Sequence, residues 1–166
     1  MFGQIIRINR ASFKPAEFIN NGWGFWRGPA DGDGLNGMIE QDTRSLFMNR
    51  IDLSEVLLES RLKDGEMYIS GEECIKRLIV AGCIRLGLRV FKTLWDNKKL
   101  IPPKFAEKTN DRDNYIFFDG QILRSPNGRR YTLCLYPYKS EWRCGQIKLS
   151  DDRYIINKSA VLAGSA

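Results

Sequence analysis

The last third of the chain alternates between apolar and polar residues, a pattern typical of β-strands with one buried face. The segment RYTLCLY alternates strictly, with its members on two faces: Tyr131, Leu133 and Leu135 on one, and Arg130, Thr132, Cys134 and Tyr136 on the other. Turn signals separate the apolar runs, at Asp119-Gly120, Ser125–Gly128, Lys139-Ser140 and 151–153. The pattern therefore predicts an antiparallel meander of about six short strands from Tyr115 onward.

The middle of the chain changes to helical spacing. SGEE, from Ser70 to Glu73, matches a capping box, in which the side chain of each end residue bonds the backbone amide of the other. A helix is predicted from this box to Ala81, with Gly82 as its stop. A second helix is predicted over 88–97, because its apolar residues form one stripe: Leu88, Phe91, Leu94 and Trp95.

Basic residues accompany both predicted helices: Lys76, Arg77, Arg85, Arg89 and Lys92. Two helices with basic side chains are also the pattern of a DNA-binding helix-turn-helix. The intervening segment AGCIRLG is longer than the tight turn of that motif, so we expect these cations to form a solvated face instead.

Short strands are predicted in the N-terminal region, at Gln4–Ile8, Ser45–Leu53 and Met67–Ile69. The range Arg44–Leu58 is ambiguous between strand and helix, and we favour a strand at Ser45–Leu53. Between the first two strands, the stretch GWGFWRGPADGDGLNG (22–37) has the glycine density of a loop.

The glycine-rich loop contains a partial calcium-binding pattern. Asp31, Asp33 and Asp42 fall at the first, third and twelfth positions of an EF-hand loop. Leu35 stands where an oxygen ligand is needed, and Asn36 stands where glycine is needed. We therefore expect a series of turns here and no metal site.

The polar segment EKTNDRDN, from Glu107 to Asn114, is the predicted boundary between two regions. Residues 1–106 would form an N-terminal α+β region and residues 113–166 a C-terminal all-β region, with one shared core as the alternative. The expected fold class is α+β: loops, short strands and two helices packed on a C-terminal meander.

The composition is that of a globular protein, since 43% of the 166 residues are apolar and 28% are charged. No run of about 18 apolar residues predicts a membrane span, and the N-terminus lacks the pattern of a signal peptide. We therefore expect a cytoplasmic protein. The net charge of +6 favours contact with nucleic acid or another anionic surface.

The residue types present exclude several kinds of chemistry. There is no histidine, which removes His-dependent catalysis and His-ligated zinc. The four cysteines (Cys74, Cys83, Cys134 and Cys144) form no C-x-x-C pair, so we expect buried thiols. A Cys134–Cys144 disulfide would need a three-residue hairpin loop and an oxidising compartment. We expect no enzyme, no cofactor and no metal, because no burial signal accompanies the acidic residues of the glycine-rich loop.

The segment RRYTLCLYPYKSEWRC, Arg129 to Cys144, combines aromatic and basic residues and admits three interpretations. Its aromatic residues can belong to the core, with Trp142 packed across from Tyr136 or Pro137. They can instead stack on the bases of a nucleic acid, among the cations of 121–148. The third interpretation is a recognition face for a protein or glycan, because Tyr, Trp and Arg are frequent in binding hot spots.

Several stretches together resemble a family of small uncharacterised proteins from candidate-phyla bacteria: GWGFWRGPADGDGLNG, QDTRSL, RIDLSEV, ISGEECIKRL, AGCIRL, VFKTLWDN, LIPPKF, YIFFDGQILRSPNGRRYTLCLY and SAVLA. The C-terminal tail of that family is rich in Trp and Tyr and varies between members, as in the variable proteins of diversity-generating retroelements. The resemblance implies ligand binding on a C-type-lectin-like scaffold. This chain departs from the family where Pro137 replaces a common tryptophan, and QIKLSDDRYIINK lacks the Trp-rich segment.

The expected function is non-enzymatic recognition of a protein or glycan by the C-terminal aromatic and basic surface, with nucleic-acid binding as the alternative. Carried over from the family, the variable positions are Tyr136, Tyr138, Lys139, Ser140, Arg143, Cys144, Gln146, Lys148, Arg153, Tyr154 and Asn157. The candidate ligand-binding residues are these without Cys144 and with Trp142, whose ring lies in the same aromatic segment.

Overall fold

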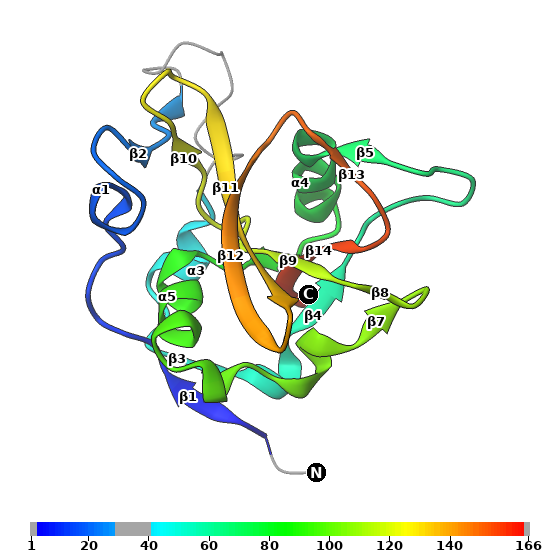
Figure 1. The fold of residues 1–166 in the computed structure, drawn as a ribbon, viewed down its shortest axis with the longest axis horizontal. Helices are drawn as coiled ribbons and strands as arrows, with labels where there is room; N and C mark the ends of the chain where they lie inside the picture. The colour runs from blue at the N-terminus through cyan, green and yellow to red at the C-terminus, as the bar shows by residue number, and fades with distance from the viewer. Residues whose placement is uncertain (1–2, 29–40, 165–166) are drawn as a thin grey trace.

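The computed structural model describes residues 3–28 and 41–164 and shows an α+β fold, as expected (Figure 1). The α-helices of this part are α1 (Pro15–Phe18), α3 (Thr43–Leu46), α4 (Gly71–Val80) and α5 (Leu88–Asp96). Short 3-10 helices add single turns, at Leu53–Glu55, Lys98–Leu100 and Pro103–Ala106. No helix of the described residues is both long enough and apolar enough to span a bilayer.

The main sheet has eight strands and is mixed. Six of them follow the order β2 (Gly24–Phe25), β10 (Leu123–Arg124), β11 (Arg130–Tyr138), β9 (Tyr115–Phe117), β14 (Asn157–Leu162) and β4 (Leu57–Glu59). Beside them, β12 (Glu141–Lys148) pairs with β11, and β6 (Ile84–Arg85) pairs with β14. The pair β9–β14 is parallel and the other pairs are antiparallel.

Three two-stranded ribbons lie outside the main sheet. They are β1 (Ile5–Arg7) with β3 (Arg50–Asp52), β5 (Ile69–Ser70) with β13 (Asp152–Arg153), and β7 (Lys108–Thr109) with β8 (Arg112–Asp113). The ribbon β5–β13 ties the C-terminal tail to the residues that precede α4.

The strand order differs from the predicted meander. Asp119-Gly120 does not close a β9–β10 hairpin, because β9 pairs with β11 instead and Asp119 is fully buried. The turns at Ser125–Gly128 and Lys139-Ser140 do join neighbouring strands, as predicted. The last strand, β14, lies between β9 and the N-terminal strand β4, so residues 1–106 and 113–166 contribute to one sheet.

Both predicted helices are confirmed, with one difference at the cap of α4. The backbone amide of Glu73 donates to Ser70 Oγ at 3.1 Å, and Gly82 follows the helix with φ of 75°. The Glu73 carboxylate does not return to the cap, because it accepts from Arg77 Nε at 3.1 Å. Arg85 is 1% exposed and lies in strand β6, so the cations near the helices do not form one solvated face.

The predicted strand at Ser45–Leu53 is wrong over most of its length. Asp42 accepts from the backbone amide of Arg44 at 3.1 Å and so caps the short helix α3, which includes Ser45. Only Arg50–Asp52 forms a strand. Nearby, the strand predicted at Met67–Ile69 is found at Ile69–Ser70.

The sheet is covered on both faces over its centre. The face that carries Leu133 and Leu135 packs in one hydrophobic core with α5, through residues such as Leu88 and Phe91. On the other face Thr132 and Cys134 are also fully buried, although the sequence pattern suggested an exposed face. Figure 1 shows the β11–β12 hairpin crossing the front of the molecule, with α5 on its left and α4 on its right.

Candidate functional site, a stripe of tyrosines

The β11–β12 hairpin sets the orientation of the C-terminal aromatic residues. Its register pairs Tyr138 with Glu141 and Tyr136 with Arg143, and the two-residue turn consists of Lys139 and Ser140. Residues that face each other across an antiparallel pair lie on the same face of the sheet. Tyr136, Tyr138 and Arg143 therefore share one face at the turn end of the hairpin.

Two cations lie against the ring of Tyr138, which is 50% exposed. Lys139 Nζ is 5.3 Å and Arg143 Cζ is 5.6 Å from the ring centroid, within the range of cation–π contacts. Deeper on the same face, Tyr136 stacks on Tyr115 of β9 with centroids 4.7 Å apart. Burial raises the pKa of the Tyr136 hydroxyl, so this ring stays neutral at physiological pH.

A second tyrosine pair continues this surface: Tyr68 immediately precedes β5, and Tyr154 immediately follows β13. Tyr154 and Tyr68 have ring centroids 5.6 Å apart and are 45% and 53% exposed. Asn157 connects the two pairs: it is the register partner of Tyr115 in β14, and its Oδ1 accepts from the backbone amide of Tyr154 at 2.7 Å. These contacts place the pair Tyr68–Tyr154 next to the pair Tyr115–Tyr136.

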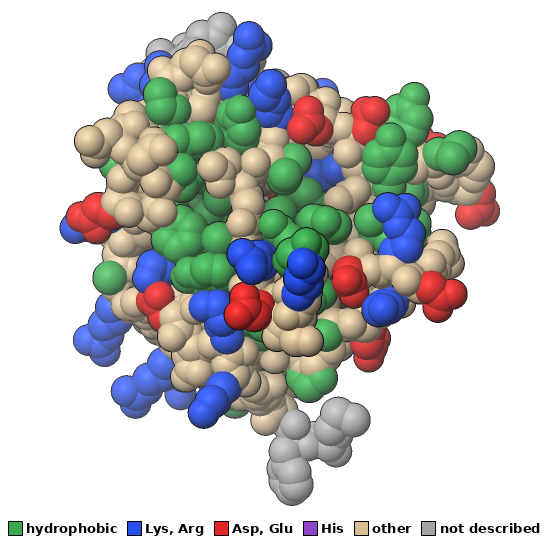
Figure 2. Space-filling model, viewed as in Figure 1, with side chains coloured by type: hydrophobic (Ala, Val, Ile, Leu, Met, Phe, Trp, Pro, Cys, Tyr) green, Lys and Arg blue, Asp and Glu red, His purple; other side chains and the backbone are tan. Residues whose placement is uncertain are grey.

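We call this surface the tyrosine stripe; its members are Tyr68, Tyr115, Tyr136, Tyr138 and Tyr154. It contains five of the six tyrosines of the chain. The sixth, Tyr131, lies on the opposite face of β11 and packs on Trp23, with ring centroids 5.0 Å apart. Figure 2 shows hydrophobic side chains exposed over the hairpin and again beside the loop that precedes β5.

A groove of about 490 Å³ lies at the Tyr154 end of the stripe. Met67 and Ile155 line it and are 76% and 38% exposed, and Arg112 of the β7–β8 ribbon lines it too. Large apolar side chains exposed together are uncommon on a protein that binds nothing there.

A buried ion pair supports the loop that presents Tyr154. Arg153 donates from both terminal nitrogens to the Asp119 carboxylate, and its guanidinium lies 4.0 Å from the Phe117 ring centroid. Burial alone would raise the pKa of Asp119, but the charge and hydrogen bonds of Arg153, with a bond from Ser159, hold it below its usual value. Tyr154 is thus adjacent to a residue fixed in the interior.

The structure brings together part of the predicted site. Tyr136, Tyr138, Lys139, Ser140, Arg143, Tyr154 and Asn157 lie on or beside the tyrosine stripe. Arg153 does not, because it is 3% exposed and paired with Asp119. Trp142, Gln146, Lys148 and the variable position Cys144 point to the opposite face of the hairpin, and Trp142 packs against the core of α5.

Two members of the stripe were not predicted from the sequence. Tyr68 precedes a two-residue strand and Tyr115 begins β9, and neither lies near the aromatic hairpin in the chain. They lie beside Tyr136 and Tyr154 only because β9 pairs with β11 and β5 pairs with β13. A run of tyrosines in one segment was the only local signal, and it marked the hairpin alone.

The four cysteines are free thiols. The hairpin loop has two residues, so Cys134 faces Gly145 and Cys144 faces Leu135, which places the two sulfurs on opposite faces of the sheet. This register excludes the Cys134–Cys144 disulfide. Burial raises the pKa of Cys134 to about 12, so that thiol stays protonated.

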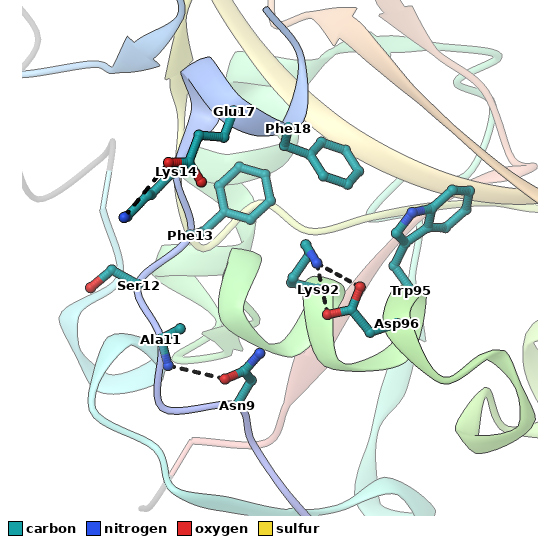
Figure 3. A pocket seen from close by; sticks show the side chains of 10 residues that line it. All are labelled: Asn9, Ala11, Ser12, Phe13, Lys14, Glu17, Phe18, Lys92, Trp95 and Asp96. Atoms are coloured by element: carbon teal, nitrogen blue, oxygen red, sulfur yellow. Dashed lines mark hydrogen bonds and ion pairs between the residues drawn. The ribbon is translucent and has the colours of Figure 1, made fainter.

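A pocket of about 480 Å³ between α1 and α5 is an alternative site (Figure 3). Phe13, Phe18 and Trp95 form its apolar wall. The rings of Phe18 and Trp95 already pack against each other, with centroids 6.3 Å apart. Lys98 Nζ covers Trp95 at 3.8 Å from the centroid. Its charged residues are also paired, as Lys14–Glu17 and Lys92–Asp96. The pocket thus leaves few groups for a ligand.

The described residues contain no group of three or more Cys, Asp or Glu side chains arranged to hold a metal ion. Asp31 and Asp33 of the partial calcium pattern lie outside the described residues. Comparison of the chain with protein-family models, with curated proteins and with solved structures gives no match. The geometry of the tyrosine stripe is therefore the basis for inference about function.

Proposed function

We propose that this chain is a non-enzymatic recognition protein whose tyrosine stripe binds a segment of a partner protein. The observation that carries the proposal is the arrangement of two tyrosine pairs, one on β9 and β11 and the other in loops, which are linked through Asn157 and are partly exposed. Tyrosine gives large contact area at low cost in conformational entropy, and it is frequent in binding hot spots.

The chemistry of the stripe favours a protein over a glycan. Met67 and Ile155 are exposed next to the tyrosines, and aliphatic side chains of this kind match the apolar side chains of a protein and not sugar hydroxyls. Two cations, Lys139 and Arg143, lie near Tyr138 at the other end, and one carboxylate, that of Glu141, pairs with Arg143 at 3.3 Å, so positive charge is in excess there. The partner segment we propose therefore has an acidic end and an apolar end.

A single-stranded nucleic acid is the second candidate ligand. The observation that favours it is that two cations lie near the ring of Tyr138, because aromatic rings among cations stack and hold successive nucleotides. The two candidates differ in salt dependence, since each phosphate contact steepens the loss of affinity with salt.

The class of ligand is tested by three parallel binding screens on the purified chain. They are a random peptide library, a glycan array, and fluorescence anisotropy of labelled oligonucleotides at about 50 and 200 mM salt. We expect acidic-apolar peptides to be selected and oligonucleotides to remain unbound. Oligonucleotide binding that falls by orders of magnitude between the two salt concentrations would favour the second candidate, and glycan hits alone would contradict a protein partner.

The family resemblance adds a proposal about the origin of the stripe. Tyr136, Tyr138 and Arg143 are positions that the resemblance assigns to a surface diversified by a retroelement on a C-type-lectin-like scaffold. A repeat of the coding sequence of the tail beside a reverse transcriptase gene would support this proposal. A locus with neither would contradict it and leave the binding proposal as it stands.

A further inference from the structure

The end of the β11–β12 hairpin that lies away from its turn carries a small cationic pocket. It has a volume of about 180 Å³, and its charged and aromatic lining residues are Trp26, Glu72, Arg129, Arg130 and Lys148. Lys148 is the register partner of Tyr131, so the end of β12 lies beside the start of β11. Glu72 comes from the first turn of α4. None of these residues belongs to the tyrosine stripe.

Positive charge exceeds negative charge in this pocket. Three cations face one carboxylate, and that carboxylate is paired with Arg130. Neither Arg129 nor Lys148 forms an ion pair with a described residue, and both are exposed to solvent. Two cations without an acidic partner on one side of a pocket attract an anion.

Trp26 provides an independent observation at the same pocket. Its side chain is 4% exposed and packs among Ile75, Ile122 and Leu149, and Arg130 lies over its ring with Cζ 5.7 Å from the centroid. Within residues 3–28 and 41–164, the indole Nε1 has no hydrogen-bond partner. A buried N–H without an acceptor is unusual, because most buried polar groups are paired.

We propose that this pocket binds a phosphate group, either as inorganic phosphate or as the phosphomonoester of a larger ligand. The three cationic side chains that line the pocket, of Arg129, Arg130 and Lys148, have donors only, which suits a ligand that presents acceptor oxygens. Arginine is well matched to phosphate because its planar fork donates two parallel hydrogen bonds. The volume admits a phosphate together with a few waters.

Arg130 is the fixed cation of the site. Its guanidinium pairs with the Glu72 carboxylate and lies over the Trp26 ring, so it is positioned before a ligand arrives. Arg129 and Lys148 are the exposed cations, whose side chains can adapt to the ligand. This proposal does not depend on the function of the tyrosine stripe.

Isothermal titration of the whole chain with inorganic phosphate, and separately with phosphoserine, tests the proposal. Sodium chloride keeps the ionic strength constant in both titrations. We expect saturable binding at one site. Binding of both ligands would indicate that the pocket accepts a monoester, and binding of inorganic phosphate alone would restrict it to the free ion; either supports a phosphate site. No saturable binding of either ligand at about 10 mM would overturn it.

Substitutions at the two exposed cations test the location of the site without disturbing the core. Arg129→Gln and Lys148→Gln are each expected to weaken phosphate binding by about tenfold, since each removes a charge-assisted hydrogen bond. Lys108→Gln, at an exposed residue of β7 outside this pocket and outside the tyrosine stripe, is the matched control and is expected to leave the affinity unchanged. Equal affinity in all three variants would place the anion elsewhere and contradict the proposal.

Discussion

The guanidinium of Arg153 donates to the two oxygens of the Asp119 carboxylate, at 2.7 and 2.8 Å, in the interior of the protein. Both residues are almost completely buried, and Thr132 of β11 and Ser159 of β14 complete the group. The pair joins the end of β9 to β13, and the next residue along the chain is Tyr154. It thus connects the sheet to one part of the tyrosine stripe.

Breaking this ion pair is expected to be costly. Arg153→Met leaves a buried carboxylate without its partner, and we expect the free energy of unfolding to fall by about 3–5 kcal/mol. Urea denaturation followed by tryptophan fluorescence measures it. The control is the double variant Asp119→Leu/Arg153→Met, which removes both charges and is expected to recover most of the loss. A single variant as stable as the parent would show that the pair contributes little.

The turn of the β11–β12 hairpin holds two residues in an unfavourable backbone conformation. Lys139 and Ser140 have φ of 48° and 64°, in the left-handed region that Asn and Gly occupy more readily. Replacing the pair by Asn-Gly is expected to raise the free energy of unfolding by about 1 kcal/mol. Thermal unfolding provides the measurement, and Lys139→Ala, which keeps a Cβ at positive φ, should show no gain. A less stable Asn-Gly variant would mean that Lys139 or Ser140 makes a favourable contact that outweighs the strain.

Gly120 is required by a close approach of two chain segments. A Cβ at this position would lie 2.6 Å from the carbonyl carbon of Leu86 and 2.7 Å from the nitrogen of Gly87. Gly120→Ala is therefore expected to lower the free energy of unfolding by about 3 kcal/mol. Gly145→Ala is the control, because its Cβ would meet only the Tyr136 ring, at 3.9 Å. Equal stability of the two variants in urea would contradict the close packing at Gly120.

Acid is expected to weaken the contact between the 63–66 turn and α4. Hydrogen bonds from Arg77 and from the backbone amide of Lys63 lower the pKa of Glu66 from 4.5 to about 2. A carboxyl whose pKa is lower in the folded state stabilises the fold above its unfolded pKa and loses that contribution as the pH falls. The loss should lie between pH 4.5 and 2.

Urea unfolding at several pH values tests this expectation with the variant Glu66→Gln. The variant should lose less stability than the parent as the pH falls through that window, whereas Glu55→Gln, at an exposed residue of a 3-10 helix, should behave as the parent does. Parallel pH profiles for the parent and Glu66→Gln would show that Arg77 does not hold the Glu66 carboxylate in solution.

Local chemistry in the sequence predicts the local structure well. The Ser70 cap, the Gly82 stop and the turn at Lys139-Ser140 each depend on residues a few positions apart, and each is found where it was expected. The alternation of β11 also predicts which of its residues share a face. These features need no knowledge of the rest of the fold.

The remaining features depend on contacts between distant segments. The pair Asp119-Gly120 has the sequence of a turn. In the structure, the Asp119 carboxylate instead accepts hydrogen bonds from Arg153, which lies 34 residues later in the chain. Thr132 and Cys134 occupy the polar face of an alternating strand, yet both are fully buried, and the Arg153 guanidinium donates to Thr132 Oγ1 on that face. The tyrosine stripe itself needs Tyr68 and Tyr115, which reach the tail only through strand pairing.

The affinity of a library-selected peptide for four forms of the protein tests the central claim most directly. Isothermal titration compares the parent with Tyr138→Ala, Tyr154→Ala and Phe47→Ala; Phe47 is 78% exposed and lies outside the stripe. We predict that each tyrosine variant weakens binding by about 2 kcal/mol, as expected for hot-spot residues, and that Phe47→Ala has no effect. Unchanged affinity in both tyrosine variants would show that the tyrosine stripe is not the binding surface.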